Sequence, residues 1–151
     1  MINVTIERSD QGFRNRWRWH ATASRWAAEV GQAMVEAVRA EAPVGKKDAN
    51  NGRLRDSITF KPTITSTNAR VEVTSRVPYV GYVINGTPPH VIEPRTATIL
   101  HWQKDGNHFY RHRVYHPGTR PNPFPERALR GRTSAIQGRM RNAVATTLGG
   151  A

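Results

Sequence analysis

Residues 116–129 read HPGTRPNPFPERAL and hold four prolines and a glycine directly before a predicted helix. Proline fixes φ and removes a hydrogen-bond donor, so a segment with this spacing is extended and ordered before it packs. Pro117 and Gly118 allow a sharp turn, and Pro125 fits the first turn of a helix. We expect Phe124, the large apolar residue of this connector, to anchor the C-terminal helix to the rest of the fold.

Apolar residues at three- and four-residue steps predict a long helix on the N-terminal side of the chain and a second one after the connector. The first helix ends before Pro43 and begins either after a cap at Ser9 or Asp10 or only near Thr22. Its apolar positions are Trp19, Ala23, Trp26, Val30, Met34 and Val38. The second helix ends at Gly149–Gly150, with arginines between its apolar positions Phe124, Ala128, Leu129, Ile136, Met140, Val144 and Leu148.

Short alternating segments predict strands between and before these helices. Residues 2–7 form one strand, and a hairpin follows the polar loop 43–53. In that hairpin Leu54, Ile58 and Phe60 share a strand face, and Val71 and Val73 mark the return strand. A helical turn ending at Gly86 precedes a second hairpin, 97–103 and 108–115, around the turn signal Asp105–Gly106.

This order of elements indicates an α+β fold. We expect an antiparallel sheet with a long N-terminal helix and a C-terminal helix packed on it, and a protruding β-hairpin. The length of 151 residues predicts a single domain, 1–151, with residues 95–117 as a hairpin extension.

The composition limits the partners and the compartment. The net charge of +12 favours nucleic acid or an acidic protein as partner, and a hydrophobic fraction of 37% fits a chain that completes its burial against other subunits. There is no cysteine, which excludes disulfides and thiolate metal sites. Without a long apolar segment or a signal-peptide pattern, we expect a soluble intracellular protein that does not enter membranes.

Catalytic and metal-binding patterns are weak. Four histidines crowd the second hairpin, and on one continuous strand His108, His112 and His116 would share a face with too few further ligands for zinc. Neither a nucleophile elbow nor a phosphate-binding glycine loop is present, and the acidic residues form no pair. We therefore predict no enzyme activity, no cofactor and no metal, and keep a histidine-based metallohydrolase as a weaker hypothesis.

Basic and aromatic residues alternate in the segment 13–26. This pattern is compatible with single-stranded nucleic acid, but helical spacing places Trp19 and Trp26 in a core. Trp17 is then the aromatic side chain left for an interface, where Trp and Arg are enriched.

Four segments in one order resemble a head–tail joining family of long-tailed bacteriophages, the neck or tail-completion proteins. They are APV at 42–44 with GRLRDSI at 52–58, PYVGYVINGT at 78–87, PPHVIEP at 88–94, and the connector itself. Residues 46–51 are an insertion relative to the family pattern, Ile84–Asn85 replace a common glutamate, and Pro125 replaces an aliphatic residue. The motif residues carried over are Pro43, Gly52, Leu54, Ser57, Tyr79, Tyr82, Gly86, Thr87, His116, Pro117, Gly118, Pro123 and Phe124.

The resemblance implies a structural virion protein without catalytic activity. It implies a homo-oligomeric ring at the head–tail junction that contacts head-connector and tail proteins. Six-fold symmetry would suit a ring that lies next to a tail. DNA would pass through without sequence-specific binding, and assembly would take place in the host cytoplasm. Trp17, Trp102, Arg139 and Arg141 are the further interface candidates. The alternative is a small basic nucleic-acid-binding protein.

Overall fold

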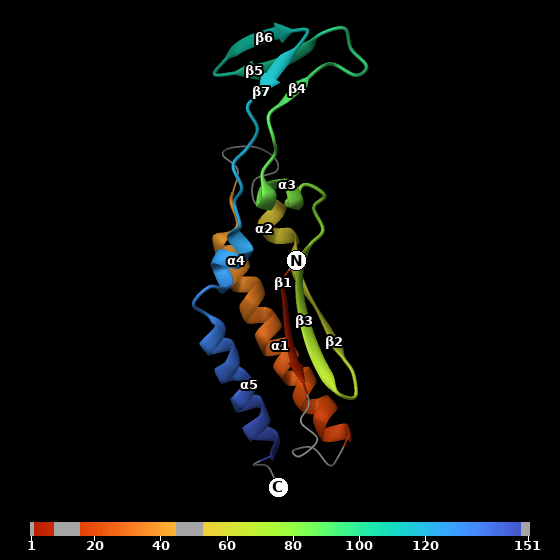
Figure 1. Ribbon diagram of the computed structural model, residues 1–151, viewed down its shortest axis with the longest axis vertical. Helices are drawn as coiled ribbons and strands as arrows, with labels where there is room; N and C mark the ends of the chain where they lie inside the picture. The colour runs from red at the N-terminus through yellow and green to blue at the C-terminus, as the bar shows by residue number, and fades with distance from the viewer. Residues whose placement is uncertain (1, 8–15, 45–52, 149–151) are drawn as a thin grey trace. The chain divides into compact units, whose positions relative to one another are not determined.

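The computed structural model describes residues 2–7, 16–44 and 53–148, and it confirms the predicted α+β class (Figure 1). The chain forms two compact units, Gly81–Asn122 and the remainder, Met1–Val80 with Pro123–Ala151. The prediction that residues 1–151 form one domain therefore stays a prediction. The elements of the larger unit are β1 (Ile2–Glu7), α1 (Arg16–Glu41), α2 (Arg53–Ser57), β2 (Ile58–Ile64), β3 (Asn68–Ser75), α4 (Phe124–Leu129) and α5 (Thr133–Leu148).

The larger unit is built on a three-stranded antiparallel sheet in the order β1-β3-β2. β3 alternates, so that Ala69, Val71 and Val73 are buried while Arg70 is exposed. The buried face packs on α1, which runs along the sheet, and α4 and α5 pack on α1 (Figure 1). Pro62 lies in the edge strand β2, a position where a missing donor is tolerated.

The core consists mainly of the apolar face of α1, as its spacing predicts. Trp19 and Trp26 are 2% and 1% exposed, which confirms their placement in the core. Two hydrogen bonds fix the helix to the sheet: Trp19 Nε1 donates to the Thr65 carbonyl at 2.7 Å, and Arg39 donates to the Ile58 carbonyl at 2.8 Å. Because the two contacts lie near opposite ends of α1, they set its direction along the sheet.

Several local predictions are corrected. α1 begins at Arg16 rather than near Thr22, and the caps Ser9 and Asp10 lie outside the described residues. Leu54 is buried on the short helix α2 rather than on a strand with Ile58. Both side chains are buried, so the spacing of apolar residues alone could not show that Leu54 lies on a helix and Ile58 on a strand.

The C-terminal helix is two helices rather than one. Arg130 leaves α4 with an extended backbone, and Gly131 has a φ of 87°, a conformation that non-glycine residues rarely adopt. Pro125 lies in the first turn of α4, as predicted, and Phe124 is 1% exposed. The anchoring role of Phe124 stays a prediction. The predicted end at Gly149–Gly150 lies outside the described residues.

The smaller unit contains α3 (Val80–Asn85, whose first residue belongs to the larger unit), β4 (His90–Ile92), β5 (Leu100–Lys104), β6 (Asn107–Arg111) and β7 (Val114–His116). β5 and β6 form the hairpin predicted around Asp105–Gly106, both of which have positive φ as the turn requires. β7 pairs with β4 instead, so His116 lies opposite His90 and is not on the strand of His108. The expectation of one strand face for His108, His112 and His116 is therefore wrong.

Candidate functional site

Two of the family motifs meet within the smaller unit. Thr87 and Thr119 exchange both backbone hydrogen bonds, each at 3.1 Å, and their hydroxyl oxygens lie 2.9 Å apart. His116 supports the bridge because its Nδ1 accepts the Gly118 amide at 3.0 Å, and the Asn122 amide donates to the carbonyls of Val83 and Ile84. We call this contact the Thr87–Thr119 bridge. It closes the loop that carries strands β4 to β7.

Glycine is required on both sides of the bridge. Gly86 has a φ of 72° and Gly118 a φ of 84°. A Cβ atom on Gly86 would collide with the Thr119 carbonyl oxygen, and one on Gly118 with the Thr87 carbonyl oxygen. Both the backbone conformation and the lack of space therefore explain why glycines occupy these two motif positions.

The smaller unit has no buried core. None of the residues 81–122 is buried, although all of them are described. Its exposed large apolar side chains include Tyr82, Val91, Trp102, Tyr110 and Tyr115, of which Tyr115 is 67% exposed. Isolated two-stranded sheets are marginally stable, and exposed apolar surface of this kind marks an interaction surface. The loop is therefore the main candidate for contact with other molecules.

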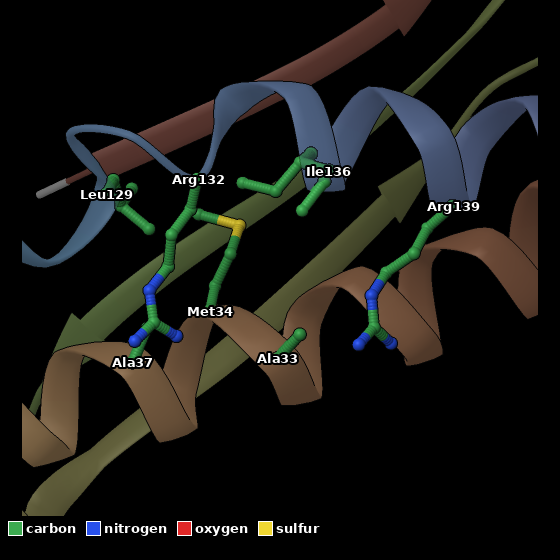
Figure 2. Close-up of a pocket in the computed structure, with 8 residues that line it drawn as sticks. Ala33, Met34, Ala37, Leu129, Arg132, Ile136 and Arg139 are labelled. Atoms are coloured by element: carbon green, nitrogen blue, oxygen red, sulfur yellow. The ribbon is translucent and has the colours of Figure 1, made fainter.

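A second candidate surface lies between α1 and α5. A cavity of about 80 Å³ is lined there by small and aliphatic residues and by two arginines (Figure 2). Arg132 and Arg139 both extend from the α5 side toward α1, where Ala37 and Ala33 lie (Figure 2). Both arginines are exposed, and neither forms an ion pair with another described residue. This groove, with an apolar floor and cationic sides, fits an acidic partner surface.

A hollow of about 400 Å³ in the larger unit brings two further motifs together. It is lined by Ser57 and Tyr79, with Arg53, Arg76, Val77 and Pro78. The Ser57 hydroxyl donates to the Leu54 carbonyl at 2.7 Å and also lies 2.7 Å from the Ser75 hydroxyl. Ser57 therefore joins the end of α2 to the end of β3, which is a structural role.

The structure distributes the other predicted residues over the two units. Leu54 and Phe124 are buried, Pro43 and Pro123 flank helices, and Tyr82 is 66% exposed. Arg141, like Arg139, is exposed on α5. Gly52, the side chain of Trp17 and the insertion 46–51 lie outside the described part.

Thr119 was missed as a site residue. The dipeptide Gly-Thr occurs at both 86–87 and 118–119, and this repetition was the available signal.

The histidines of the hairpin contact one another and their neighbours. His101 Nε2 lies 2.8 Å from His108 Nδ1 with the rings stacked, and Tyr110 stacks on His101. His112 Nδ1 donates to the Thr98 carbonyl. Among the described residues, no three metal-ligating side chains come together, and no helix is long and apolar enough to cross a membrane.

Comparison with known proteins places this geometry in context. No curated protein and no solved structure matches the chain. Residues 14–86 match a family model described as "Bacteriophage HK97-gp10, putative tail-component". The match covers just under half of the chain, from α1 through α3 to Gly86, and ends before β4 and the connector. It confirms the resemblance drawn from the motifs: the chain is similar to tail-component proteins of tailed bacteriophages.

Proposed function

We propose that this protein is a structural, non-catalytic virion component that forms a homo-oligomeric ring at the head–tail junction of a tailed bacteriophage. The observation that carries the proposal is the loop 81–122, in which no residue is buried. The family match supports it, because it makes the chain similar to phage tail components. A segment that is closed by the Thr87–Thr119 bridge but has no core gains burial when neighbouring molecules cover it.

In this proposal the larger unit is the body of each protomer, and the loop and α5 contact neighbouring subunits, head-connector proteins and tail proteins. A six-fold ring suits a position beside a tail. DNA passes through the ring without sequence-specific contacts, and assembly takes place in the host cytoplasm. The motif residues are positioning residues: Gly86, Thr87, His116 and Gly118 shape the loop, and Phe124 anchors the connector.

Three experiments test the proposal. Light scattering with negative-stain imaging of the purified protein should show rings. Deletion of the gene from its phage should yield separate heads and tails, and antibody labelling should locate the protein at the junction of complete particles. Complete, infectious particles that lack the protein would rule the proposal out.

Nucleic-acid binding is the second candidate, and one observation favours it. Residues 127–151 contain five arginines and no aspartate or glutamate. Phosphate binding of this kind weakens steeply with ionic strength because it releases condensed counterions. DNA affinity measured between about 50 and 200 mM salt tests this function; a fall of about 10³-fold or more, with no ring formation, would favour it over the structural proposal.

A further inference from the structure

The β5–β6 hairpin has two different faces. The register pairs Trp102 with Phe109 and Leu100 with Arg111, and it places Lys104 opposite Asn107. Opposite residues share a face, so Leu100, Trp102, Lys104, Phe109 and Arg111 lie on one side, which we call the tryptophan face. The other side, the histidine face, carries His101, Gln103, His108 and Tyr110.

The tryptophan face combines stacked aromatic rings with positive charge. The ring centroids of Trp102 and Phe109 lie 5.5 Å apart, and Trp102 remains 38% exposed. Lys104 and Arg111 lie at the two ends of this pair and are exposed. Trp and Arg are the residue types most enriched among the side chains that dominate binding energy at protein interfaces.

The histidine face has its polar groups engaged within the hairpin. His101 and His108 hydrogen-bond to each other at 2.8 Å, and Tyr110 stacks on the His101 ring. No Lys or Arg belongs to this face. The hairpin therefore offers a cationic, apolar surface on one side only.

The charge of the chain argues against a second copy as the partner of this face. Each carboxylate whose side chain the structure describes has a Lys or Arg nearby: Glu93 pairs with Arg113 and Glu41 with Arg127, and Glu72 lies opposite Lys61 on the neighbouring strand. The others, Glu29, Glu36, Asp56, Asp105 and Glu126, each have a Lys or Arg within four residues along the chain. With a net charge of +12, a second copy of the chain would bring mainly positive charge to Lys104 and Arg111.

We infer that the tryptophan face docks on a different virion protein, onto an apolar pocket bordered by carboxylates. Trp102 and Phe109 enter the pocket, and Lys104 and Arg111 pair with the carboxylates, which steer the encounter and fix its register. The inference rests on the proposed function, because it takes the partner from the same virion. It adds the docking face, the chemistry of the partner and the exclusion of a sister subunit.

Site-specific crosslinking tests which face docks and on what. A photo-reactive benzophenone amino acid replaces Phe109 in one variant and Tyr110 in a matched control one residue away on the opposite face. Each variant is supplied to the phage lacking the wild-type gene, and purified particles are irradiated. Position 109 is expected to crosslink to an aspartate- and glutamate-rich segment of another virion protein, at least fivefold more than position 110.

The remaining outcomes contradict the inference. Crosslinks to this chain would identify a sister subunit, and nuclease-sensitive products would identify DNA. Equal yields from both positions would show that the face is not selective, and an absence of crosslinks at 109 in particles that contain the protein would show that the face is uncovered. Complete particles of the unmodified phage that do not contain this protein would instead contradict the proposed function.

Charge reversal provides an independent readout. Lys104→Glu with Arg111→Glu is expected to lower the yield of infectious particles at least tenfold, while circular dichroism of the purified protein stays unchanged. Arg95→Glu with Arg120→Glu changes the charge of the same unit equally but leaves the tryptophan face intact, so it is expected to lower the yield less than threefold. Equal losses from both pairs would show that only the total charge matters and would overturn the inference.

Discussion

The hydroxyl oxygens of Thr87 and Thr119 lie 2.9 Å apart, although the two residues are separated by 32 positions in the chain. Their backbones also exchange two hydrogen bonds, and a glycine precedes each threonine. The Gly-Thr pairs of these two motifs are thus the two sides of one bridge that closes the loop. Formation of this bridge therefore explains why both family motifs contain the dipeptide Gly-Thr.

Replacement of Gly118 by alanine is expected to open this bridge. Alanine at positive φ costs about 1–2 kcal/mol, and its Cβ would also collide with the Thr87 carbonyl oxygen. Amide hydrogen exchange at Thr87 and Thr119 should therefore accelerate at least tenfold, since about 1.4 kcal/mol corresponds to a factor of ten. Gly106→Ala is the control, because Gly106 also has positive φ but has no atom within 4 Å of the added Cβ. Equal effects at both glycines would show that the collision is unimportant.

Phe124→Ala is expected to lower the free energy of unfolding by about 3–5 kcal/mol, as for other buried aromatic residues. Phe124 is 1% exposed, and we expect it to anchor the connector. Urea unfolding measures the change. Tyr115→Ala, at a residue 67% exposed, should change stability by less than about 0.5 kcal/mol. A wild-type midpoint for Phe124→Ala would disprove the anchoring role.

Gly31→Ala is expected to destabilise the protein even though alanine is the better helix former by about 1 kcal/mol. The added Cβ would overlap the ring of Phe60, which packs across Gly31 from β2, and overpacking of this kind costs about 1–3 kcal/mol. In a Phe60→Ala background the ring is gone, so the same change should stabilise. Thermal unfolding of the four proteins in this cycle gives the sign directly. The same sign in both backgrounds would refute the steric argument.

Charge reversal of Arg139 and Arg141 is expected to leave the protomer folded and to impair assembly or head–tail joining. Both side chains are exposed, and Arg139 lines the groove between α1 and α5. Circular dichroism reports folding, and a head–tail joining assay reports function. Arg55→Glu with Arg70→Glu is a control with the same change in charge at other exposed positions. Normal yields of tailed, infectious particles from the Arg139 and Arg141 variant would contradict the prediction.

The hairpin is expected to be mobile in the isolated protomer and ordered in the assembly, because its strands have no buried residue. Hydrogen exchange across residues 97–115 should therefore be fast in the monomer and strongly slowed in assembled necks. The amide of Trp26, in the core helix α1, is an internal reference that should stay protected in both states. Strong, equal protection of the hairpin in both states would mean that the protomer stabilises it alone.

Local chemistry made much of the fold predictable from the sequence. The spacing of Trp19, Trp26 and Val30 identified the buried face of α1, and Asp105–Gly106 identified the hairpin turn, because both patterns depend on neighbours within a few residues. Pro125 at the start of α4 and Gly86 after α3 likewise mark helix ends through their own backbone preferences. The family resemblance also came from the sequence, because it rests on these same local motifs.

Tertiary structure decided which distant segments meet. Leu54 and Ile58 are both buried, but only packing against α1 and the sheet determines that one lies on a helix and the other on a strand. The pairing of His116 with His90, and of Thr119 with Thr87, joins segments whose separation along the chain carries no periodic signal. The two faces of the hairpin also depend on its register, because a shift of one residue would move the side chains of Trp102 and His101 to opposite faces from those they occupy now. Backbone preference acts over a few residues, whereas register and burial are set by contacts across the whole chain.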